Sequence, residues 1–125
     1  MSSVELVRVL VTEVWNGGRM GLLAELFTDP FDHGGRADTV NSLRLWHANE
    51  ASTWGPVRYE ILDEVASGER VALRWQATAT RREARWDGVH FFTVQNGRIT
   101  AMWAMADRFI KAQALGVTFT PPSGS

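Results

Sequence analysis

The spacing of apolar residues changes once along the chain, from a helical period in the first half to a strand period in the second. Three stretches with helical spacing, at residues 2–15, 22–27 and 38–54, predict three helices. Ser2 is expected to cap the first of them, and Asp38 can cap the third. The glycine-containing segment 31–35, between the second and third helices, is expected to be irregular. The first half therefore consists of amphipathic helices that need a second apolar surface to pack against.

In the second half, apolar and polar residues alternate as they do in strands with one buried face. The alternation predicts strands at residues 57–65, 71–79, 84–95 and 98–107. The dipeptide Asn96-Gly97 joins the last two strands and favours a two-residue hairpin turn. The second half is therefore expected to form an antiparallel sheet.

A two-residue turn would also set the pairing of the last two strands. It places His90 opposite Trp103 and Trp86 opposite Asp107, with Met105 on the same face. The other face of this hairpin carries Val89 and Phe91 and is too apolar to be left in water. We therefore expect a homodimer that forms through the outer face of the sheet.

A last helix is expected from Arg108 to Gly116. The stretch 118–125 contains two prolines and ends in Ser-Gly-Ser, so it is expected to be a flexible tail. The prediction is one α+β domain over residues 1–117, in which three N-terminal helices pack on a curved antiparallel sheet and a C-terminal helix follows.

Composition narrows the function classes. The chain has 125 residues, a formal net charge of -1 and no run of lysine or arginine, which argues against a nucleic-acid or membrane partner. No membrane span and no signal sequence are apparent, so a cytoplasmic location is expected. The absence of cysteine excludes disulfides and thiolate catalysis. Lys111, the only lysine, reads as an exposed helix position unsuited to Schiff-base chemistry.

Cofactor and metal sites also lack support in the sequence. The three histidines have no recognised ligand spacing, so no metal site is expected. No glycine-rich nucleotide motif and no Gly-x-Ser-x-Gly motif are present, so no cofactor is expected.

Six tryptophans in so short a chain are unusual, because large aromatic side chains either fill a core or line a pocket for a flat ligand. Trp46 can belong to either group. The expected substrate-binding residues are Trp15, Trp46, Trp75, Trp86, Phe92, Trp103 and Met105.

Asp107 is the leading candidate for acid–base chemistry. It ends a strand whose inward face is apolar, and desolvation there would favour the neutral acid, which can donate a proton. Alternatively, Asp107 caps the helix that follows or pairs with Arg108.

His90 shares the predicted face with Asp107 and is a candidate proton relay, although a lone histidine on an apolar strand can also be a core residue with one hydrogen bond. Asp32 and His33 precede two glycines in a loop expected across the pocket mouth, where functional residues often lie. Alternatively, Asp32 only forms a turn with its own backbone. His47 reads as a surface residue.

Several segments together resemble a known family, the SnoaL-like polyketide cyclases, whose fold is shared with nuclear transport factor 2 and ketosteroid isomerase. The segments are 13–18 (EVWNGG), Leu26-Phe27, Asp32-His33-Gly34 and 96–99 (NGRI), followed by Trp103 and Asp107.

The resemblance implies a cone-shaped α+β barrel, usually dimeric, with a helix-lined cavity and with Asp107 as general acid or base. It implies a cofactor-independent cyclase or isomerase that acts on a polyketide-like hydrophobic substrate in natural-product biosynthesis. Related enzymes that open epoxides use two acidic residues, for which Asp32 would be the second here. A third hypothesis is a binding module without catalysis.

Overall fold

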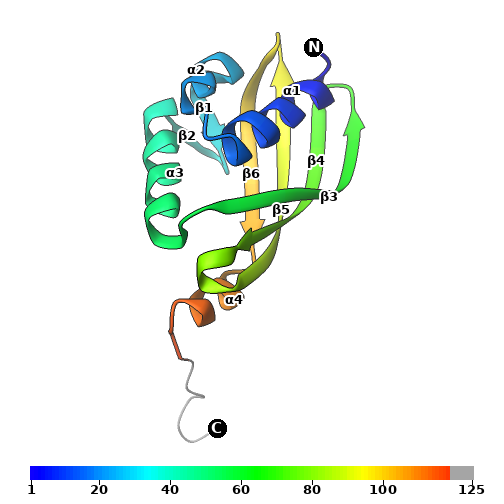
Figure 1. The fold of residues 1–125 in the computed structure, drawn as a ribbon. Coiled ribbons are helices and arrows are strands. Elements are labelled where there is room, and N and C mark those ends of the chain that lie inside the picture. The colour runs from blue at the N-terminus through cyan, green and yellow to red at the C-terminus, as the bar shows by residue number, and fades with distance from the viewer. Residues whose placement is uncertain (119–125) are drawn as a thin grey trace, which may run out of the picture.

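A computed structural model describes residues 1–118 and has the predicted α+β fold. Four α-helices of these residues flank one sheet (Figure 1). A π-helix, η1, extends the first of them, and the helical elements are α1 (Ser3–Val9), η1 (Leu10–Asn16), η2 (Met20–Leu22), α2 (Leu23–Leu26), α3 (Val40–Trp54), η3 (Thr80–Arg82) and α4 (Arg108–Ala114). Apart from Thr118, the predicted flexible tail lies outside the described residues.

The sheet has six strands in the order β2-β1-β6-β5-β4-β3, and within the described residues it stays open between β2 and β3. Among the strand pairs of residues 1–118, only β1–β6 is parallel. The sheet is therefore mixed, whereas the sequence predicted a purely antiparallel sheet. The strands are β1 (Phe27–His33), β2 (Arg36–Asp38), β3 (Val57–Ser67), β4 (Arg70–Ala79), β5 (Ala84–Gln95) and β6 (Arg98–Ala106).

The four predicted strands are confirmed as β3 to β6, whereas β1 and β2 were not predicted: they flank and partly occupy the segment 31–35 that was expected to be irregular. Asp29-Pro30 interrupts the alternation of β1, and β2 is only three residues long, so neither strand shows a period-two pattern in the sequence. These two strands carry His33 and Asp38.

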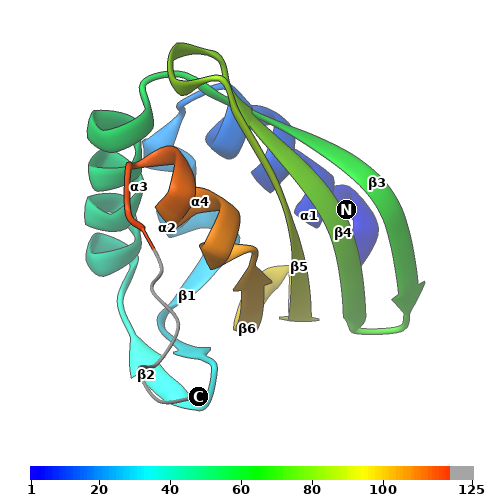
Figure 2. The same ribbon diagram turned by 90° about the horizontal axis from the view of Figure 1, so that it is seen from below.

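The sheet curves around α1 and η1 (Figures 1 and 2). In the view from below, α3 lies beside β1, and α4 packs against β5 near the end of the sheet (Figure 2). No helix of residues 1–118 is long and apolar enough to cross a membrane.

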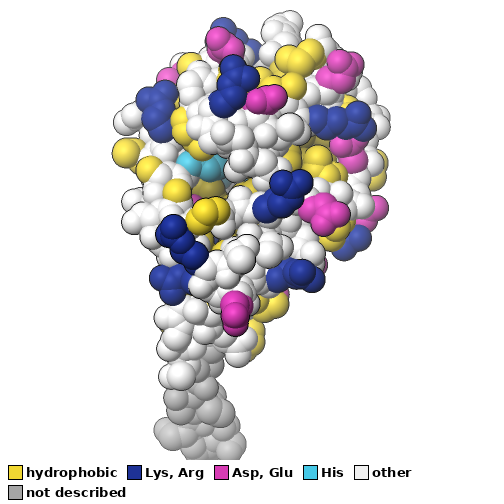
Figure 3. All heavy atoms as spheres, viewed as in Figure 1, with side chains coloured by type: hydrophobic (Ala, Val, Ile, Leu, Met, Phe, Trp, Pro, Cys, Tyr) yellow, Lys and Arg dark blue, Asp and Glu magenta, His cyan; other side chains and the backbone are white. Residues whose placement is uncertain are grey.

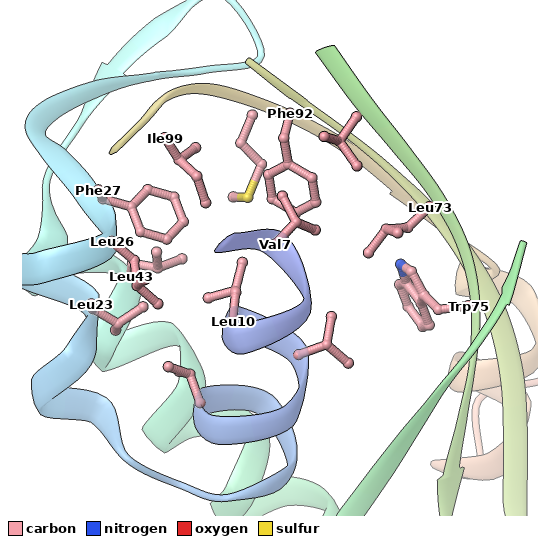
Figure 4. Packing of buried hydrophobic residues seen from close by; sticks show 14 of the residues in the cluster. Val7, Leu10, Leu23, Leu26, Phe27, Leu43, Leu73, Trp75, Phe92 and Ile99 are labelled. Atoms are coloured by element: carbon pink, nitrogen blue, oxygen red, sulfur yellow. The ribbon is translucent and has the colours of Figure 1, made fainter. Parts of the chain in front are cut away.

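The apolar core lies between α1 and the concave face of the sheet. Val7 and Leu10 of α1 and η1 point toward Phe92 and Ile99 of the sheet (Figure 4). Each of these side chains is at most 1% exposed, and full burial of an aliphatic or aromatic side chain contributes about 1.5–3 kcal/mol. Burial of this face therefore holds the helices on the sheet.

A side-chain cap starts α1 at Ser2, as the sequence predicts, whereas α3 is capped by Thr39 instead of the predicted Asp38. The N–H of Glu5 donates to the Ser2 hydroxyl at 3.1 Å, and the N–H of Ser42 donates to the Thr39 hydroxyl at 3.1 Å. These bonds satisfy backbone donors that have no partner within the helix.

The β5–β6 hairpin follows the predicted register only at its tip. Gln95 pairs with Arg98 across the Asn96-Gly97 turn, as expected. Between Ile99 and Ala101, however, β6 contains one extra residue, Thr100, which is a β-bulge.

Beyond this bulge the predicted partners are wrong by one residue. His90 lies opposite Ala104 instead of Trp103, and Phe91 lies opposite Trp103. Because side chains alternate between faces, the shift moves Trp103 and Met105 to the outer face, where they are 43% and 62% exposed.

Gly88 of β5 lies opposite Trp75 of β4 and makes room for the indole. A Cβ atom built at Gly88 would overlap the six-membered ring of Trp75, so only glycine fits without a shift of the ring. The position of Trp75 on the concave face therefore depends on Gly88.

We predict that Gly88→Ala lowers the free energy of unfolding by about 1–3 kcal/mol, because overpacking of a dense interior forces side chains out of place. Urea denaturation monitored by tryptophan fluorescence measures the loss. The control is Gly21→Ala, where a Cβ meets nothing within 4 Å and stability should stay within about 1 kcal/mol of the unaltered protein. Equal stability of both variants would contradict the close contact.

Candidate active site

A cavity of about 690 Å³ lies between the concave face of the sheet and the helices. On the face shown in Figure 3, a histidine side chain lies in a recess between hydrophobic side chains. Of the predicted substrate-binding residues, Trp15, Trp46, Trp75 and Trp86 line the cavity. Met105 only borders it, because Met105 is 62% exposed and lies on the outer face of β6.

Two predicted wall residues do not line the cavity. Phe92 is fully buried in the core, and Trp103 is turned to the outer face by the bulge in β6. Trp46 lies in an intermediate position, since it lines the cavity but is 48% exposed. Small residues, Ala104 and Ala106, occupy the inner positions of β6, which leaves the space open.

One wall of the cavity is a group of aromatic rings in mutual contact. The Trp15 ring centroid lies 5.1 Å from that of Tyr59 and 4.8 Å from that of His90, and Tyr59 lies 5.3 Å from Trp75. Tyr59 was not among the predicted site residues, although it occupies an apolar position in the alternation of β3. Burial raises the pKa of the Tyr59 hydroxyl, which therefore stays protonated.

Asn16, at the end of η1, holds Tyr59 in place through the backbone. Its side-chain amide donates to the Tyr59 carbonyl at 2.9 Å and its side-chain oxygen accepts the Tyr59 N–H at 2.7 Å. Trp15 and Tyr59 therefore meet because neighbouring residues tie the helix to β3.

His33 lines the cavity and forms a pair with Asp38. The two residues come from adjacent strands that Gly34-Gly35 connects, and Nδ1 of His33 lies 2.9 Å from Oδ2 of Asp38. The hydrogen bond from His33 holds the pKa of the Asp38 carboxyl below its usual range. Because an ionised carboxylate only accepts hydrogen bonds, Nδ1 carries the proton, and the basic nitrogen of the neutral imidazole is then Nε2.

Asp32 is exposed, and it does not line the cavity. Its carboxylate accepts the N–H of Gly35 at 2.8 Å and so stabilises the tight turn between β1 and β2. This is the turn-forming alternative that the sequence left open.

His90 lies on the inner face of β5 and lines the cavity. Burial lowers the pKa of His90 to about 3, and the positive charges that His33 and His47 can carry lower it further. Its Nδ1 accepts a hydrogen bond from the Trp75 indole at 2.8 Å. His90 is therefore a neutral imidazole with a fixed neighbour.

Asp107 does not lie inside the cavity, so its predicted placement is wrong. The strand ends at Ala106, and the exposed Asp107 carboxylate accepts the N–H of Ile110 at 3.1 Å as the N-cap of α4. The physical reason is the extra residue in β6, which changes the face on which every later residue of the strand points. The helix-capping alternative is the one that the structure shows.

The profile of the SnoaL-like domain matches residues 7–102, which is more than half of the chain. The chain belongs to the SnoaL-like family. Among curated proteins, no sequence match was found.

Solved structures agree with this fold. A SnoaL-like polyketide cyclase from Agrobacterium tumefaciens is 16% identical, with 93% of this chain and 99% of that chain covered and a TM-score of 0.80. A candidate polyketide cyclase from Bacillus cereus is 22% identical, with 94% and 82% covered and a TM-score of 0.83. AclR from Streptomyces galilaeus, a candidate hydroxylase, is 17% identical, with 91% and 95% covered and a TM-score of 0.79. At these identities the likeness establishes the fold alone.

In this SnoaL-like domain, α4 covers one end of the cavity through Lys111. Its ammonium lies 3.1 Å from the Glu50 carboxylate of α3 and 5.0 Å from the Trp86 ring centroid. The Lys111 side chain is only 20% exposed, so it is not the exposed helix residue that the sequence predicts.

His47 of α3 also lines the cavity, although the sequence reading placed it on the surface. Burial lowers the pKa of His47 to about 4. Within residues 1–118, no three histidine or carboxylate side chains are grouped so that they could hold a metal ion.

The lowered pKa values of His47 and His90 make the stability of the protein depend on pH. Both bind protons more weakly when folded, so their contribution is complete above the unfolded pKa of 6.5 and is lost as the pH falls toward about 4 and about 3. As the pH falls from 6.5 to about 5, each histidine should lower the free energy of unfolding by up to about 1.4 kcal/mol per pH unit.

We predict that His47→Gln makes this acid dependence shallower, because glutamine does not titrate. Urea denaturation at several pH values in this range measures the slope. Parallel slopes for the variant and the unaltered protein would show that His47 is not shielded from water.

Proposed function

We propose that this protein is a cofactor-independent cyclase or isomerase that acts on a polyketide-like hydrophobic substrate in natural-product biosynthesis. The observation that carries the proposal is the His33–Asp38 pair on the wall of an aromatic cavity. A histidine oriented by a carboxylate is a common device for moving one proton to and from a substrate. The family assignment and the candidate cyclases among the solved structures support this class of reaction.

The cavity suits a substrate that must fold before it reacts. Trp15, Trp75 and Trp86 offer flat apolar surfaces against which conjugated or aromatic groups can stack. Such surfaces hold the reacting carbons near each other, and correct orientation alone can remove a large part of the barrier. The catalytic side chain then needs only to remove one proton from the substrate and return it.

An intramolecular aldol closure needs one proton taken and one returned. Nε2 of His33 removes a proton from the carbon beside a ketone, and the electron pair of that C–H bond forms the enolate. The enolate carbon attacks a second carbonyl, a C–C bond forms, and the carbonyl electrons move to oxygen. The resulting alkoxide takes the proton back from the imidazolium, which the Asp38 carboxylate stabilises in the meantime.

The epoxide-opening alternative has less support. It requires two acidic side chains at one site, whereas Asp32 stabilises a turn and Asp107 caps α4. Neither of them lines the cavity.

We predict that His33→Asn reduces turnover by about 100-fold or more, the range expected for a positioned acid–base group. The assay follows ring closure of a synthetic aryl diketone that can form a six-membered ring, by mass spectrometry and ultraviolet absorbance. Asp38→Asn should also lower the rate, because the imidazole loses its orienting carboxylate.

The matched control is Asp107→Asn. Asparagine caps a helix about as well as aspartate, so this variant should fold and keep its rate. Loss of turnover in Asp107→Asn with an unchanged rate in His33→Asn would assign the acid–base role to Asp107 and refute the proposal. Binding of the diketone without product in the unaltered protein would favour a binding module.

We also propose that two copies associate through the outer face of the sheet. Phe91 and Trp103 are 40% and 43% exposed, their ring centroids lie 5.7 Å apart, and Met105 beside them is 62% exposed. An exposed apolar group of this size on a sheet is typical of a buried contact between subunits.

Trp103→Glu should convert the dimer into a monomer, because a charge without a partner opposes burial. Light scattering after size-exclusion chromatography measures the mass. Leu45→Glu, which alters an exposed residue of α3 outside the proposed interface, should leave the dimer intact. A monomeric unaltered protein would refute the proposal.

A further inference from the structure

The hydrogen bond between Trp75 and His90 determines which nitrogen of His90 carries the proton. The indole Nε1–H donates to Nδ1 of His90 at 2.8 Å, and an indole N–H cannot accept a hydrogen bond. Nδ1 must therefore be the unprotonated nitrogen. In a neutral imidazole the proton then resides on Nε2.

The His90 ring has little freedom to turn. Its centroid lies 4.8 Å from Trp15 and 5.4 Å from Phe92, whose ring is stacked on it at 16°. Trp75, in turn, points inward from β4 over Gly88, where no side chain opposes it (Figure 4). The direction of the Nε2–H bond is therefore set by the surrounding packing.

The Nε2–H group is available to a ligand. Among the described residues no partner bonds to it, yet every fully buried side-chain nitrogen or oxygen of these residues has a partner. Nε2 is thus not shut inside the protein, and His90 lines the cavity. The group opens into the space where a substrate would lie.

We propose that the Nε2–H of His90 is a fixed hydrogen-bond donor for a carbonyl or enolate oxygen of the substrate, and that Trp75 is a positioning residue that selects this tautomer. This role rests on the proposed function and adds to it the chemical class of the group bound beside β5. A neutral imidazole that donates to an oxygen stabilises developing negative charge without giving up its proton. His90 is then an electrophile, and the acid–base work remains with His33.

The tautomer can be read directly. Long-range proton–nitrogen NMR of uniformly ¹⁵N-labelled protein should show, for His90, a protonated Nε2 and an unprotonated Nδ1, with His90→Phe identifying its signals. Trp75→Phe, which removes only the indole donor, should produce a mixture of tautomers. Trp46→Phe, at the exposed side of the cavity, should leave the His90 signals unchanged. A protonated Nδ1 in the unaltered protein would overturn the proposal whether or not Trp75→Phe folds.

The donor can be tested with two probes that differ only in one oxygen, fluorenone and fluorene. The carbonyl stretch of bound fluorenone should lie at lower frequency in the unaltered protein than in His90→Phe. The affinity for fluorenone should fall about 2- to 10-fold in that variant, the effect of one neutral hydrogen bond, while the affinity for fluorene stays the same. An unshifted carbonyl stretch, or equal losses for both probes, would overturn the proposal.

These measurements need no turnover, so they separate this inference from the proposed reaction. His33→Asn should reduce turnover by about 100-fold or more and leave the fluorenone shift intact. Retained catalysis in His33→Asn with a normal fluorenone shift would refute the base but not the donor.

Discussion

One additional residue in β6 decides what the cavity contains. Thr100 has no partner in the pairing with β5, and its hydroxyl bonds to Gln95 at 3.1 Å instead. After it, Trp103 and Met105 turn outward, and Ala104 and Ala106 turn inward beside Met102. A strand without the bulge would put the large side chains on the concave face, and the space between the sheet and the helices would be much smaller.

The helices and the four long strands follow from periodicity because each has one buried face. The cap at Ser2 and the turn at Asn96-Gly97 could also be predicted, because they depend on local hydrogen bonds and backbone angles. The strand β1 was missed because it pairs in parallel with a strand distant in sequence and contains Pro30. A bulge such as Thr100 has no compositional mark, so a register that is correct at the turn becomes wrong a few residues later.

In the candidate site too, residues with a local sequence signal could be predicted, and residues that depend on tertiary contacts could not. His33 was placed at the cavity from its position before two glycines, whereas its partner Asp38 was read as a helix cap because the hairpin that joins them was not foreseen. Tyr59 and His47 depend on tertiary packing and have no local signal. Asp107 shows the converse, since its family position suggested catalysis and its local sequence, before a helix, correctly suggested a cap.

The contact between Asn16 and Tyr59 has a consequence beyond the cavity. β3 is the last strand of the sheet, and its outer edge carries backbone groups that a foreign strand could pair with. At Tyr59 both of these groups are already bonded to one asparagine side chain. A chain approaching this edge would have to displace that amide first, so the residue that anchors a wall of the cavity also protects the sheet against growth into larger aggregates.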